Sequence, residues 1–285
     1  MKNSVEQAYS PEMLRKLHGV EMEILKKFIL ICEKHHLEYF ALYGTALGAI
    51  RHRGIIPWDD DIDVGMLRED YDRFFRIAGQ EFGPGYSLIN SMLDPHYPFM
   101  TARVMKDNTE FRTKSMKRTK CPSGIFLDIF CLDNLPDNPG ERRSFLRKCW
   151  VWGKVSILRN LSIPNLPYKG IKRYAVFAVC LFAHVAVKII PRSFLHRYMN
   201  GLRQRYNAEK TKDVGFCFLL DPEKSIYPLD HILPTREVPF EDIAIKVPNK
   251  VEAVMETAFG PDYMTPLPEG ERSHIIPYIL DFGEE

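Results

Sequence analysis

The sequence predicts an α/β (α+β) protein in which short strands alternate with amphipathic helices. Ser10 and Pro11 predict a helix start, and apolar residues recur at helical spacing from there to about residue 33, and again along 68–80. Stretches rich in β-branched and aromatic residues at 37–43, 86–90, 99–105 and 124–133 predict strands, and 238–248 predicts a small hairpin. The 285 residues are 45% hydrophobic and 27% charged, an ordinary composition for a globular protein with a sizeable core.

Charge and cysteine usage argue against several classes of function. The net charge is only +2, so the sequence does not predict a protein that binds nucleic acid. The six cysteines are scattered with no C-x-x-C pair, which indicates free thiols in a reducing compartment rather than disulfides or a zinc site. Residues 1–15 contain no apolar signal-peptide core. We therefore expect a cytoplasmic protein.

The most hydrophobic stretch, 174–190, has two interpretations. It falls short of the roughly 20 residues that span a membrane, and it contains His184 and Lys188. We expect a buried helix. The alternative is an interfacial helix on the inner face of the cytoplasmic membrane, because basic residues flank the stretch and would meet anionic headgroups. These flanking residues are Lys169, Lys172, Arg173, Lys188, Arg192 and Arg197.

The stretch 43–66 combines a small-residue turn, basic residues and four carboxylates. Gly44 and Thr45 follow a predicted strand and open a predicted helix, where phosphate can approach the backbone N–H groups. Further along, Arg51, His52 and Trp58 precede the acidic run. This combination within one short span predicts a single pocket.

The acidic run itself predicts a metal site. If 61–64 is a strand, Asp61 and Asp63 share one face about 6.5 to 7 Å apart, and Asp60 points to the other face. Two carboxylates on one face repel each other unless a cation neutralises them, and Mg²⁺ or Mn²⁺ prefers such hard oxygen ligands. Asp59 shares this face in an ideal strand, but it adjoins Trp58 at the turn, so its role stays open.

Other interpretations of the acidic run fit less well. A solvated loop conflicts with the apolar residues that alternate through it. A calcium-binding EF-hand needs Gly and Glu where Val64 and Asp70 stand. Carboxylates that merely cap the following helix would suit Asp70 better than Asp61.

Asp128 interrupts the apolar strand predicted over 124–133. A lone carboxylate costs several kcal/mol to bury unless a cation neutralises it, so we interpret Asp128 as the third ligand beside Asp61 and Asp63. The alternative is a salt bridge between Asp128 and an arginine. Asp133 is predicted to lie in the turn after this strand. Arg103 and Lys106, on the preceding strand, are candidates for holding phosphate oxygens.

These motifs resemble the signature of the LicD family, bacterial phosphocholine transferases related to fukutin and fukutin-related protein. The strongest resemblance runs from Tyr43-Gly44-Thr45 to Trp58-Asp59-Asp60-Asp61-Ile62-Asp63. Residues 127–136 resemble the second acidic motif of the family, with Cys131 where Pro is expected. Residues 238–248 and 259–268, with His274, resemble its C-terminal end, where Phe259 replaces a usual Tyr. The middle of the chain, 142–213, carries the least resemblance.

The resemblance implies a fold and an organisation. The fold is a nucleotidyltransferase-like core with a mixed sheet flanked by helices, plus a mainly helical middle insertion. We expect a catalytic core over 1–140, a helical subdomain over 141–213, which is membrane-peripheral under the interfacial alternative for 174–190, and a C-terminal part, 214–285, that completes the domain.

The resemblance also implies an activity. The implied reaction moves a phosphoalcohol, typically phosphocholine, from a CDP-linked donor such as CDP-choline to a sugar hydroxyl and releases CMP. The acceptor would be a cell-surface or lipid-linked glycan, such as lipopolysaccharide, teichoic acid or capsule. Two alternatives stay open: a nucleotidyltransferase acting on a small substrate, and a non-enzymatic, calcium-binding, membrane-peripheral protein.

The resemblance assigns expected roles to the residues singled out above. Asp61, Asp63 and Asp128 would hold Mg²⁺ or Mn²⁺, and Asp59 or Asp128 would be the general base. An aromatic cage for choline would come from Trp58, Tyr43 or Tyr97. The residues expected to bind the phosphates are Gly44, Thr45, Arg51, His52, Arg103 and Lys106.

Overall fold

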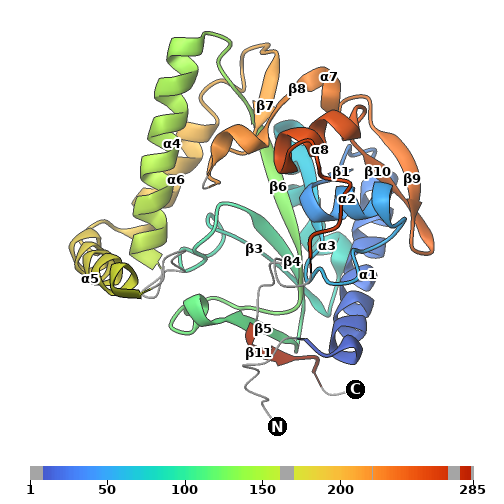
Figure 1. Cartoon of the computed structure of the whole chain (residues 1–285), viewed down its shortest axis with the longest axis horizontal. Helices are drawn as coiled ribbons and strands as arrows, with labels where there is room; N and C mark the ends of the chain where they lie inside the picture. The colour runs from blue at the N-terminus through green and yellow to red at the C-terminus, as the bar shows by residue number, and fades with distance from the viewer. Residues whose placement is uncertain (1–8, 161–169, 220, 269–276, 284–285) are drawn as a thin grey trace.

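The fold is taken from a computed structural model of the chain (Figure 1). It describes residues 9–160, 170–219, 221–268 and 277–283. Lys169 and His274, named above, lie outside these ranges, and the side chain of Arg173 lies outside the described part of α5.

A mixed sheet lies at the centre of the described structure and confirms the predicted α+β class. Strands β2 and β6 are parallel, and the other neighbouring strands are antiparallel. Strand β7 pairs with the end of β6, and β8 pairs with β7. The strand order across the sheet is β1 (Phe40–Ala41), β2 (Asp63–Leu67), β6 (Phe126–Asn134), β4 (Ala102–Lys106) and β3 (Tyr86–Asn90), with β7 (Asp213–Gly215) and β8 (Ile226–Pro228) added beside β6.

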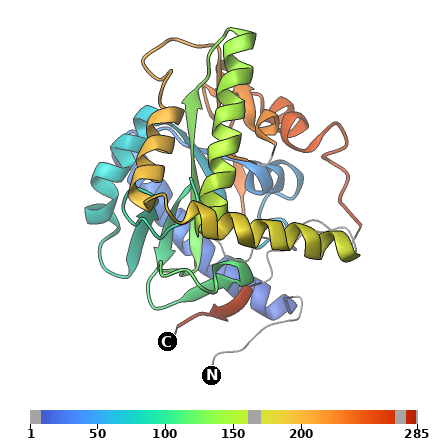
Figure 2. The same ribbon diagram turned by 90° about the vertical axis from the view of Figure 1, so that its left-hand side faces the viewer.

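Helices lie on both sides of this sheet. Helices α1 and α3 pack against each other and against the central strands, while α4 and α6 lie on the other side in both views (Figures 1 and 2). The bounds of the α-helices are α1 (Pro11–Lys34), α2 (Tyr43–Arg51), α3 (Arg68–Phe82), α4 (Pro139–Asn160), α5 (Gly170–Val187), α6 (Arg192–Arg203), α7 (Leu229–Ile232) and α8 (Val251–Phe259).

The long first helix has the start that the sequence predicts. The Ser10 hydroxyl accepts a hydrogen bond from Met13 N at 3.1 Å, and Pro11 occupies the first turn. Phe28, on the buried side of α1, packs edge-on against Phe74 of α3 with ring centres 5.1 Å apart. Burying such a side chain contributes about 1.5–3 kcal/mol, so this aromatic contact helps to fix α1 over the sheet.

Two smaller sheets and two short 3-10 helices complete the described structure. The predicted hairpin near residue 240 is confirmed as β9 (Arg236–Phe240) and β10 (Ile243–Val247). Near the end of the chain, β11 (Pro277–Asp281) pairs with β5 (Glu110–Thr113), so the C-terminal part returns to the first half of the chain. The 3-10 helices are η1 (Lys114–Met116) and η2 (Pro222–Ser225).

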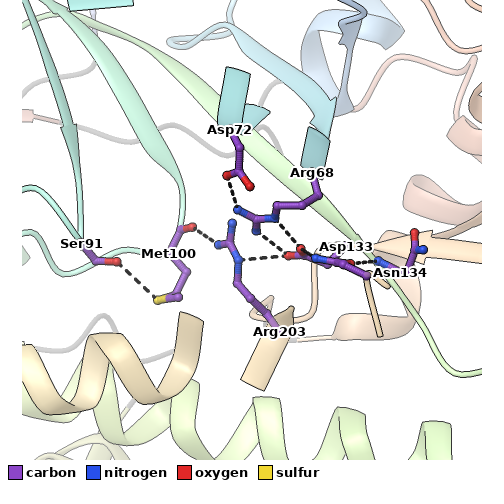
Figure 3. A network of polar contacts seen from close by, with 8 residues as sticks. Arg68, Asp72, Ser91, Met100, Asp133, Asn134 and Arg203 are labelled. Carbon is purple, nitrogen blue, oxygen red and sulfur yellow. Dashed lines mark hydrogen bonds and ion pairs between the residues drawn. The ribbon is translucent and has the colours of Figure 1, made fainter. Parts of the chain in front are cut away.

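Asp133 corrects one sequence prediction. It does not lie in a turn: it is the penultimate residue of β6 and only 2% exposed. Arg68 donates to both its carboxylate oxygens, at 2.8 and 2.9 Å, and Arg203 Nε lies 3.0 Å from Oδ2 (Figure 3). Arg203 also donates to the Met100 carbonyl at 3.0 Å. This buried network therefore ties α3 and α6 to the end of β6.

Helix α5 corrects another prediction, because it is not buried. Figures 1 and 2 show it projecting from the body beside the lower end of α4. Ile171 is 89% exposed and Phe182 is 79% exposed. His184, near the other end of the helix, is buried and donates from Nδ1 to the Leu158 carbonyl. Within the described residues, α5 is the one helix whose length and apolar composition would allow it to cross a membrane.

Candidate active site

The central strands bring two distant carboxylates side by side. Asp63 is the first residue of β2, and its neighbour on the parallel strand β6 is Asp128. The ladder begins one residue earlier, where Asp128 N donates to the Ile62 carbonyl at 3.0 Å. One carboxylate oxygen from each of Asp61, Asp63 and Asp128 lies within 4.8 Å of the others. The structure thus brings together the three residues that the sequence predicts as metal ligands.

The residues before β2 form a second acidic group. Asp61 precedes the strand, so the predicted strand over 61–64 begins later, at Asp63. Strand alternation therefore does not apply to Asp60, and the prediction that it faces away is wrong: Asp59, Asp60 and Asp61 each place an oxygen within 4.8 Å of the others. Val64 is buried in β2, which also excludes an EF-hand loop here.

The electrostatics of this site favour a bound cation. Burial and the neighbouring carboxylates raise the pKa values of Asp61 and Asp63 well above the ordinary range. Burial, with Asp60, raises the pKa of Asp59 to about 6. Clustered carboxylate oxygens are the donor set that Mg²⁺ and Mn²⁺ prefer, so the residues present fit such an ion.

The sequence left open whether Asp128 joins the other carboxylates or forms a salt bridge with an arginine, and in the structure it does both. Besides facing Asp61 and Asp63, it accepts hydrogen bonds from Arg103 Nε at 2.9 Å and Nη2 at 3.0 Å. The Arg103 guanidinium is buried and lies 3.5 Å from the centre of the Phe126 ring. Arg103 therefore holds Asp128 in place, and the prediction that it binds phosphate is not supported by this geometry. Carboxylate oxygens carry further lone pairs, so Asp128 can still bind a cation.

A cavity of about 460 Å³ opens over the acidic residues. Its walls come from the start of α2, the acidic loop, and the segment that follows α8. The aromatic side chains that line it are Tyr43, Trp58, Phe259 and Tyr263, and the acids are Asp59, Asp60, Asp61, Asp63 and Asp262. A larger cavity, of about 1290 Å³, is lined by Glu38, Lys246 and neighbouring segments; neither acidic group is among its described lining residues. We place the candidate site by its chemistry, in the smaller cavity.

The turn residues Gly44 and Thr45 support the acids directly. A Cβ atom at Gly44 would lie 2.3 Å from Asp59 Oδ2, so the missing side chain makes room for that carboxylate rather than for phosphate. The Thr45 hydroxyl accepts a hydrogen bond from Asp63 N at 2.8 Å. Both residues therefore fix the acidic loop against the start of α2.

The predicted basic residues are only partly brought together. Arg51 lines the cavity, and its Nη1 donates to the Tyr263 carbonyl at 2.9 Å. His52 ends α2 and packs edge-on against Trp58, with ring centres 5.7 Å apart, but it is not part of the described lining. Lys106 forms an ion pair with Glu23 of α1 and lies over the Tyr86 ring, so it does not join the site.

The aromatic lining also differs from the prediction. Tyr97 is buried, and its hydroxyl pairs with Thr101 at 3.1 Å, which in turn donates to Asp128 at 3.3 Å. Tyr97 therefore reaches Asp128 through Thr101 and is not among the described lining residues of the cavity. Sequence reasoning missed Phe259 and Tyr263 as cavity residues. Their helix-ending motif, Phe259-Gly260-Pro261, is visible in the sequence, but nothing local shows that it folds back over residue 58.

The mixed sheet, the glycine at the start of α2 and the carboxylates on adjacent parallel strands agree with the nucleotidyltransferase-type domain that the sequence predicts. Comparison with family models specifies it further: residues 36–136 match the family described as LicD/FKTN/FKRP, nucleotidyltransferase domain. Residues 36–136 therefore carry a LicD-family domain, as the resemblance in the sequence indicated.

Curated relatives agree with this assignment. Lipopolysaccharide cholinephosphotransferase LicD of Haemophilus influenzae is 37% identical over 127 residues, which cover 44% of this chain and 46% of that protein. Human ribitol 5-phosphate transferase FKRP is 36% identical over 61 residues, which cover 21% of this chain and 12% of FKRP. An uncharacterised protein of Rickettsia typhi, RT0683, is 39% identical over 66 residues, 23% of this chain and 21% of its own length. The matched part of the chain thus spans less than half the length of these relatives.

Proposed function

We propose that this protein transfers a phosphoalcohol, phosphocholine in the first instance, from a CDP-linked donor to a sugar hydroxyl of a cell-surface glycan. The family of its domain supports the proposal, and so do the names of two relatives, a cholinephosphotransferase and a ribitol 5-phosphate transferase. The observation that carries it is the group formed by Asp61, Asp63 and Asp128 beside a cavity that can hold a donor.

The proposed chemistry is a displacement at phosphorus. The acceptor hydroxyl oxygen bonds to the phosphorus that carries the alcohol, the bond from that phosphorus to the bridging diphosphate oxygen breaks, and CMP leaves. Asp59, which lines the cavity, accepts the hydroxyl proton. Mg²⁺ or Mn²⁺ on Asp61, Asp63 and Asp128 would supply the positive charge that phosphoryl transfer requires.

Arg51 is the proposed contact for the donor phosphates. Its Nη1 donates to the Tyr263 carbonyl and its Nε to His52 Nδ1, which holds the guanidinium at the cavity wall. The Nη2 group would donate to a phosphate oxygen. A guanidinium suits this task because its charge-assisted hydrogen bonds to phosphate are stronger than neutral ones.

The aromatic lining supports a cationic head group. A quaternary ammonium ion is attracted to the faces of aromatic rings, most strongly to tryptophan. Trp58 and Tyr263 line the same cavity as the acids, and Tyr43 and Phe259 add further aromatic surface. Choline therefore suits this cavity better than an uncharged polyol, and this preference is part of the proposal.

Helix α5 supports a proposed location on the inner face of the cytoplasmic membrane, where a lipid-linked glycan would be available. Its apolar side chains are exposed along most of the helix, and Lys172 and Lys188 are also exposed. Apolar surface combined with nearby basic residues is the pattern of a helix that lies at the membrane interface.

The product of the reaction tests the proposal. Purified protein is incubated with Mg²⁺ or Mn²⁺, a panel of CDP-alcohols labelled in the alcohol, and surface-glycan fractions. We expect CMP and labelled glycan in equal amounts, most with CDP-choline. Pyrophosphate released from a nucleoside triphosphate, with no label transferred from any CDP-alcohol, would instead indicate the alternative, a nucleotidyltransferase acting on a small substrate.

A further inference from the structure

Helix α1 places one more carboxylate beside the acidic loop. Glu21 is only 1% exposed, and its Oε2 atom has no hydrogen-bond partner among the residues that the structure describes. The neighbouring core positions on the same side of α1, Leu17 and Ile24, are fully buried and apolar. A carboxylate at this position is costly, because a buried polar atom without a partner loses about 1–3 kcal/mol. Packing therefore does not explain why this core position of α1 carries a glutamate.

The contacts of α1 show which way this part of the helix faces. His18, one turn before Glu21, donates from Nε2 to the Asp59 carbonyl at 2.8 Å. Tyr9, just before the helix, donates to Asp60 Oδ2 at 3.1 Å. Residues three apart on a helix share a face, so Glu21 lies on the side of α1 that contacts the acidic loop.

The surroundings of Glu21 are negative. Burial raises its pKa well above the ordinary range, and the charges of Asp61, Asp60 and Asp59 add to this effect. Glu23, two residues further along α1, is neither buried nor without a partner. It is half exposed and forms an ion pair with Lys106. No lysine or arginine is described as a partner of Glu21.

We propose that Glu21 is a further ligand residue of the metal site, contacting a divalent cation on the Asp60 and Asp61 side of the cluster directly or through one metal-bound water. Asp59, Asp60 and Asp61 already place oxygens within 4.8 Å of one another, and Glu21 adds a buried carboxylate on the side of α1 that contacts this loop, with an Oε2 atom that has no described partner. The inference rests on the proposed function only for the presence of a cation; it requires neither the donor nor the acceptor.

Metal binding tests this directly, without turnover. Free Mn²⁺ is measured by electron paramagnetic resonance during titration of the full-length wild type, Glu21→Gln and the matched control Glu23→Gln. Loss of a residue that supports a metal typically weakens affinity by 10–100-fold. We therefore expect Glu21→Gln to bind Mn²⁺ about 10–100-fold more weakly, while Glu23→Gln binds as the wild type does. Wild-type affinity and stoichiometry in a folded Glu21→Gln variant would overturn the proposal.

Two further measurements keep the result interpretable. Circular dichroism establishes whether Glu21→Gln folds; if it does not, Glu21→Asp keeps the charge but shortens the side chain, and its Mn²⁺ affinity should fall by an intermediate amount. Unchanged affinity in Glu21→Asp would then overturn the proposal. If no CDP-alcohol supports transfer but Mn²⁺ binding still depends on Glu21, the proposed function fails while this inference stands.

Discussion

We predict that Gly44→Ala lowers the rate of transfer without destabilising the fold. Gly44 lies in the first turn of α2 and its backbone φ is not in the left-handed region, so alanine is tolerated there. Alanine is favoured over glycine within helices by up to about 1 kcal/mol. The free energy of unfolding should therefore stay the same or rise slightly.

The effect on activity follows from one distance. The new Cβ would lie 2.3 Å from Asp59 Oδ2, and contacts under 3.0 Å essentially never occur, so this carboxylate oxygen must move by about 0.7 Å. The displaced atom is the end of a side chain, which moves at little cost in stability. A displacement of about 1 Å in a reacting group can reduce a rate about 100-fold. We expect a loss of this order in kcat/KM.

Gly79→Ala is the matched control. It also replaces a helical glycine, in α3, but its Cβ would meet no atom within 4 Å. Both variants are compared with the wild type by CMP release and by urea unfolding. Gly79→Ala should keep full activity. Equal activity in Gly44→Ala and Gly79→Ala would refute the role assigned to the position of Asp59.

Three further predictions concern the head group, the buried network and α5. Trp58→Ala should raise the KM for CDP-choline about 30-fold, as a lost cation–π contact of about 2 kcal/mol implies, and leave the KM for CDP-ribitol nearly unchanged; equal changes for both donors would contradict an aromatic cage. Asp133→Ala should lower the free energy of unfolding by about 3–5 kcal/mol in denaturant titrations, because it leaves Arg68 and Arg203 without their buried partner; a loss below about 1 kcal/mol would contradict this. Phe182→Asp should reduce co-sedimentation with anionic lipid vesicles several-fold while CMP release from soluble substrates stays unchanged, and wild-type sedimentation would exclude α5 as the membrane contact.

Local sequence signals predicted much of the fold. The Ser10-Pro11 start and the apolar periodicity located α1, and the buried charge of Asp128 pointed to a site shared with Asp61 and Asp63. These predictions hold because a cap, a periodic pattern and a charge within an apolar strand can all be recognised from the local sequence.

The wrong predictions share one physical cause, because each was decided by contacts with residues that are far away in the sequence. Asp133 has the neighbours of a turn residue, but its partners Arg68 and Arg203 are far away in the chain. Arg103 and Lys106 both look like phosphate ligands in isolation, yet one pairs with Asp128 and the other with Glu23. The composition of α5 suggested burial, but composition alone does not show whether another element covers a helix.

Glu21 was missed although a signal was present. It falls four residues after Leu17 and three before Ile24, so the same periodicity that predicted α1 places a carboxylate on its apolar side. A charged residue at a core position of a helix is unusual, and it would have justified a search for a partner or a ligand.

The rate of CMP release by Asp63→Asn tests the central claim most directly. Asparagine keeps the size of the side chain but removes the charge between Asp61 and Asp128. The measurement uses saturating CDP-choline, Mn²⁺ and the acceptor glycan, with Asp242→Asn, a surface ion-pair variant, as control. The proposed site predicts a loss of at least about 100-fold in Asp63→Asn and none in the control. Turnover of Asp63→Asn at the wild-type rate would contradict a catalytic role for these carboxylates.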